Sequence, residues 1–316
     1  MALSLGDVPE LHEFLRWLRA RNGRAGGPRV RYTGADLPGS LGSPLPALEA
    51  IAAHLDACDP EALPALERAR ELVGRLHDPA PMKALLGYPS ADQAERDALT
   101  AALGELSARI QRSARAQRAA GREAGHAVAA HHLRGAWLLD HLHRSFTDEG
   151  IEAASTYRDL YLAETVLHLL EQDPAARVVL VAHNWHVKKA PEPFGSGELF
   201  PAGHHLAAEL GTDYRAIGLT SRTGRTAVAS GDLTGVDGFP FQEAPLPPLE
   251  EAAIESAFPG TAPWALADLR AAGAATDAAE YTRMRMADYF CDQPALDCFD
   301  AIVCVAETNG TAHTRG

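Results

Sequence analysis

The sequence predicts an α/β fold: a mostly parallel sheet flanked by helices, with an all-helical insertion. Three observations support this prediction. Continuous apolar runs of the kind that buried parallel strands show occupy 177–182 and 299–306. A period of 3.6 residues, typical of an amphipathic helix, precedes the first run over 156–171. From about residue 46 to residue 150, the sequence consists largely of Ala, Leu, Arg and Glu in helical periods.

Near the amino terminus a helix is followed by a strand. Apolar residues recur at i, i+3, i+4 and i+7 across 8–21, which predicts an amphipathic helix ended by Asn22-Gly23. Residues 29–36 alternate and contain β-forming residues, which predicts a strand leading into the Pro/Gly-rich loop 38–46. Helix followed by strand is typical of an α/β core.

The chain therefore divides into a core, residues 1–57 and 150–316, and a helical insertion, residues 58–149. Within the second part of the core we predict, in order, a helix over 203–210, strands over 214–221 and 225–230, a proline-rich surface loop over 238–263 and the strand 299–306.

The composition is that of a globular chain with small-molecule rather than polyanionic partners. Of the 316 residues 46% are apolar, and the formal net charge of −13 disfavours nucleic acid and anionic membranes. No apolar run approaches the roughly 18 residues of a membrane helix, and the amino terminus lacks a signal pattern, so we expect a cytoplasmic protein. The four cysteines form no Cys-x-x-Cys pair and predict free thiols: Cys58, Cys291, Cys298 and Cys304.

The segment Ala182-His183-Asn184-Trp185-His186 is the sharpest candidate for a site. It directly follows the apolar run 177–182, and ligands of open α/β sheets bind at the carboxyl ends of strands. Because imidazole exchanges protons near neutral pH, His183 is the first candidate for general acid or base catalysis. A histidine held at a strand end for structural reasons is an alternative of equal weight, and His186 is a weaker candidate.

The other histidines give no defensible metal site. The spacing of His183 and His186 relative to His204 and His205 fits no zinc pattern, so we expect no metal and no cofactor. The histidines of the insertion do not repeat at i, i+4, and we expect them to be solvated side chains of helices: His126, His131, His132, His141 and His143.

A second candidate segment is Thr156-Tyr157-Arg158-Asp159, at the predicted start of the helix before the apolar run. Thr156 and Asp159 resemble a capping box, so Asp159 can be a helix cap. Asp159 also shares its helical face with apolar residues, which places it toward the core. Arg158 can bind a carboxylate in bidentate fashion.

Two carboxylates are weaker candidates. Glu164 lies further along the same helix and cannot be told from a solvated surface residue. Asp36 ends the predicted strand 29–36 and is a pocket carboxylate or a turn former with equal weight. Gly-x-Ser-x-Gly, P-loop and Gly-x-Gly-x-x-Gly motifs are absent from the sequence, so the serine hydrolase, nucleotide triphosphatase and dinucleotide-binding classes lack their motif.

Together these segments resemble the erythromycin esterase family, whose members carry Arg-Asp at a helix start, then Met-Ala-Glu-Asn, then a strand ending in Ala-His-Asn-x-His. The matching residues here are Arg158-Asp159, Leu162-Ala163-Glu164-Thr165 and Ala182–His186. Further similar segments extend the resemblance over nearly the whole chain: Trp17–Asn22, Arg31–Asp36, Ala202–Leu206, Asp213–Gly218 and Phe299–Val303 with Glu307-Thr308.

The resemblance implies an α/β fold with a helical insertion and hydrolysis of an ester, in the named members a macrolide lactone. Water attacks with the help of a histidine and without a covalent serine. His183 is the active-site histidine that the resemblance carries over, with Arg158 and Glu164 as supporting residues. Substrate-binding candidates are Asp159, Asn184, His186, Asp36 and His205.

The departures from the family limit this reading. Family members open with a strand carrying Gly-Glu-x-x-His-Gly and a second strand with Glu-Gly, and this sequence contains no Gly-Glu-x-x-His-Gly. Half of the implied site is thus absent, and we expect a chain that is marginally stable, forms a homo-oligomer or is completed by a partner that supplies strands. Thr165 replaces the family's Asn, and Lys188-Lys189 stand where Gly-Asp often follows.

Three functions therefore compete. The first is an esterase-like hydrolase acting on an ester or lactone of a small natural product, with His183 as general base for water. The second is a non-catalytic remnant that binds the ligand without hydrolysing it. The third is a lyase or dehydratase of a biosynthetic pathway, which uses the same histidine as a base.

Overall fold

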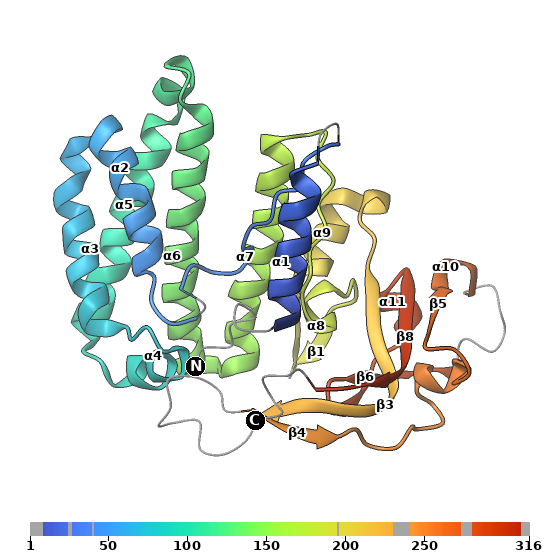
Figure 1. Ribbon diagram of the computed structural model, residues 1–316. Helices are drawn as coiled ribbons and strands as arrows, with labels where there is room; N and C mark the ends of the chain where they lie inside the picture. Colours follow the sequence, from blue (N-terminus) through green and yellow to red (C-terminus); the bar gives the residue numbers. More distant parts are fainter. Residues whose placement is uncertain are drawn as a thin grey trace. The chain divides into compact units, whose positions relative to one another are not determined.

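A computed structural model describes residues 9–24, 27–39, 41–194, 196–229, 241–272 and 280–310. Within these residues the chain forms two compact units (Figure 1). The helical unit comprises residues 35–180, and the sheet unit comprises residues 9–34, 181–229 and 241–310. The insertion predicted over 58–149 lies inside the helical unit, which also contains the helices on either side of it.

Turn-forming residues delimit the helices of the helical unit. Prolines stand in the first turns of its first helices, where a missing N–H costs nothing. Asp92 caps the helix that begins at Gln93 by accepting the Glu95 N–H at 3.1 Å. Gly121 and Gly150 adopt positive φ at the following turns. The elements are α2 (Leu45–Cys58), η2 (Pro60–Ala62), α3 (Leu63–Leu76), α4 (Pro81–Gly87), η3 (Tyr88–Ser90), α5 (Gln93–Ala119), α6 (Glu123–Glu149) and α7 (Ile151–Gln172).

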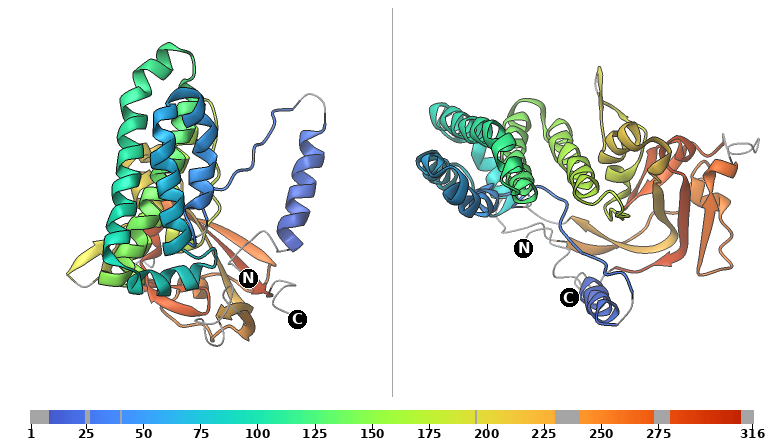
Figure 2. Two further views of the ribbon diagram at one scale, coloured as in Figure 1. Left: turned by 90° about the vertical axis from the view of Figure 1, so that its left-hand side faces the viewer. Right: turned by 90° about the horizontal axis from the view of Figure 1, so that it is seen from above.

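One continuous apolar core holds these helices together. Helices α5 and α6 form a long antiparallel hairpin, beside which α2 and α3 pack (Figures 1 and 2). Leu48, Ile51 and Leu66 are completely buried at these contacts, as are Leu103 and Leu106. A second cluster around Leu138 and Leu139 packs α6 against α7. The prediction that the insertion is helical is thus confirmed.

The sheet unit contains short helices and hairpins around one larger sheet. Its elements are α1 (Pro9–Asn22), α8 (Asn184–Val187), β1 (Glu192–Phe194), β2 (Gly197–Leu199), α9 (Ala202–Leu210), η4 (Gly211–Asp213), β3 (Ile217–Ala229), β4 (Phe241–Pro245), η5 (Ile254–Ala257), β5 (Trp264–Asp268), α10 (Leu269–Ala272), β6 (Arg283–Met286), β7 (Tyr289–Asp292), α11 (Ala295–Cys298) and β8 (Ala301–Thr308).

The larger sheet has the strand order β4-β3-β8-β5 and is mixed. Strands β3 and β8 run parallel, whereas β4 and β5 pair antiparallel with β3 and β8 respectively. The expected α/β class with a helical insertion is confirmed, but in the described residues the sheet is not mostly parallel. Strand β8 contains the predicted run 299–306 almost entirely, and the two strands predicted over 214–221 and 225–230 are one strand, β3.

Two predicted strands are wrong. Residues 29–36 and 177–182 join no β-ladder of the described structure. Val179 and Val181 are 86% and 82% exposed, although they alternate in the apolar run. An apolar or alternating pattern does not suffice for a strand, which also requires a neighbouring backbone to accept and donate its hydrogen bonds. The loop predicted over 238–263 contains β4 and η5, with residues 238–240 outside the described residues.

Candidate active site

The predicted site residues are distributed over both units. Asp36, Arg158, Asp159 and Glu164 belong to the helical unit, and His183, Asn184, His186 and His205 belong to the sheet unit. Each set is described within its own unit.

Arg158, on α7, forms a bidentate ion pair with Asp36. Its Nε lies 2.8 and 3.1 Å from the two carboxylate oxygens, and its Nη2 lies 2.6 Å from Oδ2. Burial alone lowers the pKa of Arg158, but the hydrogen bonds and charge of Asp36 outweigh it and raise this pKa. The predicted bidentate contact therefore exists with a carboxylate of the chain itself. A substrate carboxylate must displace Asp36 to reach this guanidinium.

Asp159 is not a helix cap. Helix α7 begins at Ile151, about two turns before Asp159, because Gly150 ends α6 with a positive φ. Asp159 is only 2% exposed, which confirms that its side of the helix faces the core. Thr156 is likewise an interior helix residue rather than the start of a capping box.

Glu164, further along α7, pairs with Arg134 of α6. The Arg134 Nε and Nη2 atoms lie 3.0 Å and 2.8 Å from the Glu164 oxygens Oε2 and Oε1. Glu164 is half-buried, so it differs from a freely solvated carboxylate. Thr165 next to it donates to the Tyr161 carbonyl at 2.8 Å, and the His131 ring lies 2.9 Å from its hydroxyl. These contacts tie α6 to α7.

His183 precedes α8 as its N-cap residue. The Trp185 backbone N–H donates to the His183 Nδ1 at 3.2 Å. An acceptor nitrogen carries no proton, so the proton of the neutral ring lies on Nε2. His183 is exposed, and nearby protein atoms desolvate its ring only in part; this desolvation lowers the pKa of His183, and the charge of nearby His186 lowers it further. The neutral imidazole therefore dominates at neutral pH.

Asn184 is a structural anchor between α8 and the sheet. Its side-chain NH₂ donates to the Leu219 carbonyl at 2.6 Å, and its Oδ1 accepts the Leu219 N–H at 2.9 Å. The amide thus completes hydrogen bonds of β3 as a neighbouring strand would. This arrangement holds α8 against β3.

The two lysines after α8 are the feature that sequence reasoning missed. The side chain of Lys188 is completely buried, with its Nζ 2.6 Å from the Glu192 Oε2. The Lys189 Nζ lies 2.6 Å from the Asp300 Oδ2. A pair of adjacent lysines predicts solvated charges, because lysine is almost never fully buried unless it is paired. No local signal in the sequence identifies the distant partner Asp300.

Helix α9 brings His204 to the backbone of Lys189. The His204 Nδ1 donates to the Lys189 carbonyl at 3.0 Å, whereas His205 lies with its ring centroid 6.3 Å from that of Phe200. Gly203 permits the close approach of α9, because a Cβ at this position would lie 2.2 Å from the Val187 carbonyl oxygen. His183, Asn184 and His186 are on or beside α8, and His205 is on the helix packed against it.

The comparisons with known proteins agree with this architecture. The family model described as erythromycin esterase matches residues 4–308, which is almost the entire chain. The chain belongs to the erythromycin esterase family.

Individual members of the erythromycin esterase family differ considerably from this chain in sequence. This chain is 26% identical to erythromycin esterase type II of Escherichia coli over 257 residues, which cover 79% of this chain and 61% of the relative. It is 39% identical to erythromycin esterase type I of the same organism over 77 residues, 24% of this chain and 18% of the relative. The chain thus spans less than two thirds of the length of these curated relatives.

Solved structures share the fold. A His-to-Asn mutant of an erythromycin esterase in its open conformation matches with a TM-score of 0.79 and 24% identity, covering 94% of this chain and 72% of the other. A succinoglycan biosynthesis protein matches with a TM-score of 0.68 and 13% identity, covering 96% and 71% of the two chains.

The histidines of the helical unit are not the solvated side chains that the sequence predicts. His126 and His143 are buried, at 6% and 0% exposure, and each contacts the ring of a second histidine. The ring nitrogens of His54 and His126 lie 3.0 Å apart, as do those of His77 and His143. The spacing of histidines along one helix could not predict these contacts, because the two contacting histidines are 72 and 66 positions apart in the sequence.

Two further observations bear on the chemistry of this family member. All four cysteines are free thiols, as predicted. Burial raises the pKa of Cys291, Cys298 and Cys304, the last to about 11, which keeps these thiols protonated.

None of the described helices is long and apolar enough to span a membrane.

Proposed function

We propose that this protein is a hydrolase that cleaves an ester or lactone of a small natural product by histidine-assisted attack of water. The observation that carries the proposal is the position of His183. It belongs to the Ala-His-Asn-x-His segment by which the chain resembles its family, and its Nε2 has no hydrogen-bond partner among the described residues.

The environment of His183 supports this assignment. Because the pKa of the ring is lowered below its ordinary value, the imidazole is mostly neutral at neutral pH. The hydrogen bond from Trp185 fixes the ring, so that a substrate meets an oriented group. The family resemblance also carries over Arg158 and Glu164, and their pairs with Asp36 and Arg134 hold them in defined positions within the helical unit.

The reaction adds one water to the substrate. Water attacks the carbonyl carbon, the bond from that carbon to the alkoxy oxygen breaks, and the products are a carboxylic acid and an alcohol. For a lactone both groups remain in one molecule, whose mass rises by that of water. Elimination by a lyase removes mass instead, and a binding protein leaves the substrate unchanged.

The experiment incubates the purified chain with a panel of macrolide lactones and simple carboxylic esters and follows products by mass spectrometry. We expect a gain of one water in at least one substrate, and we expect His183→Ala to lower kcat/KM by at least about 100-fold. The reason is that the oriented imidazole and its ring N–H are lost.

His12→Ala is the matched control, since this histidine is exposed on α1. It should retain wild-type kcat/KM. Equal turnover of the His183→Ala variant and the wild type would contradict the proposal. Ligand binding without any mass change would instead favour the binding protein, and a loss of mass would favour the lyase.

A further inference from the structure

We infer that Lys188 is a positioning residue, whose buried ammonium group fixes Trp185 and thereby holds the His183 ring with its proton on Nε2, toward the substrate. This inference rests on the proposed function and specifies how its histidine works. Lys188 acts through other residues and does not itself touch the substrate.

Lys188 is held on three sides inside the sheet unit. Its Nζ forms the ion pair with Glu192 at the start of β1 and donates to the Gln293 Oε1 at 3.1 Å. The same Nζ lies 4.3 Å from the centroid of the Trp185 ring. Gln293 in turn donates to the Cys298 Sγ at 2.9 Å. Since lysine at a buried position is retained only where its charge is fully paired, this arrangement is a built feature of the fold.

The contact with Trp185 links Lys188 to His183. A cation over an indole face is attracted by the ring, most strongly where both groups are desolvated. The Lys188 backbone also closes α8, because its N–H donates to the Asn184 carbonyl at 3.0 Å. Lys188 therefore fixes Trp185 in two ways: its ammonium group contacts the indole ring, and its backbone N–H closes the helical turn that contains Trp185. Its backbone N–H then determines which nitrogen of His183 accepts.

The resulting tautomer determines the chemistry available to His183. With Nδ1 accepting from Trp185, the neutral ring presents an N–H at Nε2, and this N–H can only donate. Such a group stabilises the oxyanion that forms on the carbonyl oxygen when water attacks. His183 keeps its proton throughout, so the proton that the attacking water loses passes to a second water molecule, which returns it to the leaving alkoxide. His183 is then a hydrogen-bond donor rather than the general base that the sequence predicts.

The experiment compares Lys188→Met with Lys189→Met. Lys189 is a matched control because its ion pair with Asp300 has the same 2.6 Å length, but it has no ring contact with Trp185 among the described residues. The first readout is the ¹⁵N chemical shift of the His183 ring nitrogens, assigned by difference from His183→Gln. The second readout is kcat and KM with the substrate of the preceding experiment.

In the wild type and in Lys189→Met we expect a protonated Nε2 and an unprotonated Nδ1. In Lys188→Met we expect a mixture of tautomers, and kcat reduced between about 10- and 100-fold with KM changed less than about threefold, because the donor is present but misoriented. In Lys188→Met the Glu192 carboxylate loses its partner, and this can impair folding. The double variant Lys188→Met/Glu192→Gln also removes the Glu192 charge, and it should show the same mixture of His183 tautomers.

Two results would overturn the inference: a protonated Nδ1 in the wild type, or the same His183 shifts in both lysine variants. Neither depends on turnover, since the shifts are measured without substrate. Failure of the proposed function is separate, because it appears as an absence of hydrolysis in a wild type whose Nε2 is protonated.

Discussion

The helical unit and the sheet unit bury their apolar side chains to different extents. In the helical unit the apolar faces of α2, α3, α5 and α6 meet in one core, with many leucines at 0% exposure. In the sheet unit, alternate residues of β3 and β5 stay open: Ile217 at 49%, Leu219 at 65%, Trp264 at 61% and Leu266 at 60% exposure.

This difference teaches that helix prediction and strand prediction depend on different information. A helix pairs its backbone groups within itself, and its apolar stripe needs only some apolar partner. A strand needs a neighbouring backbone in register, and that neighbour lies elsewhere in the sequence. The helices predicted over 8–21, 156–171 and 203–210 are therefore confirmed in their described residues, whereas the strands predicted over 29–36 and 177–182 lack a ladder.

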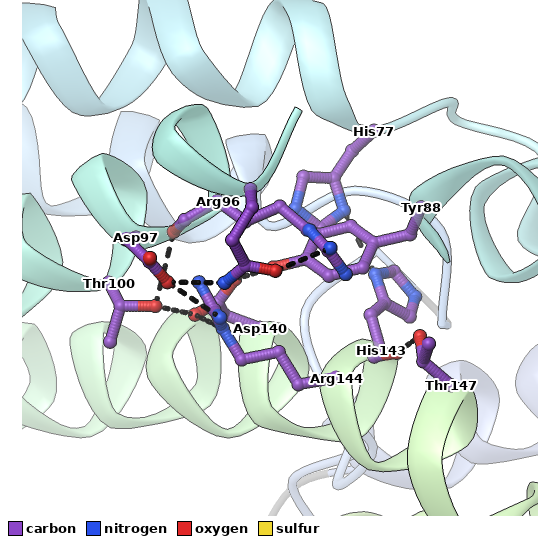
Figure 3. A network of polar contacts seen from close by, with 10 residues as sticks. His77, Tyr88, Arg96, Asp97, Thr100, Asp140, His143, Arg144 and Thr147 are labelled. Atoms are coloured by element: carbon purple, nitrogen blue, oxygen red, sulfur yellow. Dashed lines mark hydrogen bonds and ion pairs between the residues drawn. The ribbon is translucent and has the colours of Figure 1, made fainter. Parts of the chain in front are cut away.

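The helical unit also contains a buried polar network (Figure 3). Asp140, at 0% exposure, accepts from the Tyr88 hydroxyl and from the Thr100 hydroxyl, each at 2.5 Å. Arg144 lies 3.3 Å from the Asp140 Oδ2 and 3.2 Å from the Asp97 Oδ1. Burial and the Asp140 charge raise the pKa of Tyr88, so its hydroxyl remains a donor.

The largest expected effect follows from this network. Asp140→Ala leaves the Tyr88 hydroxyl and the Arg144 cation without their buried partner, which typically costs about 3–5 kcal/mol. We expect the free energy of unfolding of the helical unit to fall by this amount, as measured by urea denaturation followed by far-ultraviolet circular dichroism.

The control is Glu67→Ala, which removes an exposed partner of Arg70 on α3. It should change the free energy by less than about 1 kcal/mol. If Asp140→Ala lowered the free energy of unfolding no more than Glu67→Ala does, the polar network would contribute little to stability. The two units would then differ only in the burial of their apolar side chains.

The second effect concerns pH and His77 with His143. Burial lowers the pKa of His77 to about 3 and that of His143 to about 4, and the charge of His143 lowers the pKa of His77 further. Both folded-state values lie below the ordinary 6.5, so the unfolded chain takes up protons first as the pH falls. The two neutral rings stabilise the fold fully above pH 6.5, and this contribution decreases toward pH 4 and then pH 3.

We expect the helical unit to lose on the order of 6 kcal/mol between pH 6.5 and pH 4, roughly 3 kcal/mol from each of these two histidines. His143→Gln retains a donor for the Leu41 carbonyl but does not titrate, so its stability should decrease less steeply. The measurement is urea denaturation at a series of pH values. If the free energy of unfolding decreased equally steeply with falling pH in His143→Gln and in the wild type, the role assigned to His143 would be wrong.

The smallest effect is expected on the open face of the sheet. Leu219→Thr and Leu266→Thr replace side chains that are mostly exposed, so each should change the free energy of unfolding by less than about 0.5 kcal/mol. Binding of a hydrophobic dye by the native protein should decrease. Leu103→Thr, at a completely buried position of α5, is the comparison and should cost several kcal/mol. A similar cost at Leu219 would mean that this face is covered in solution.

The candidate site shows the same division between local and distant information. The segment that contains His183 was found from the sequence, because an apolar run followed by histidine and asparagine is a local pattern. The pairing of Arg158 with Asp36, 122 positions away, and of Lys188 with Gln293, 105 positions away, has no local signature. The chemical types of these groups can therefore be read from the sequence, but their partners cannot.

By itself, the sequence determined the family resemblance, the helical insertion, the face of Asp159 and the free state of the cysteines. Each depends on local order: helical periodicity, motif order or cysteine spacing. Only the tertiary structure decided the mixed sheet, the buried histidine pairs, and the contacts that orient the ring of His183. These depend on which distant segments meet, and desolvation at those contacts sets both the energy of a charge and the nitrogen that carries a proton.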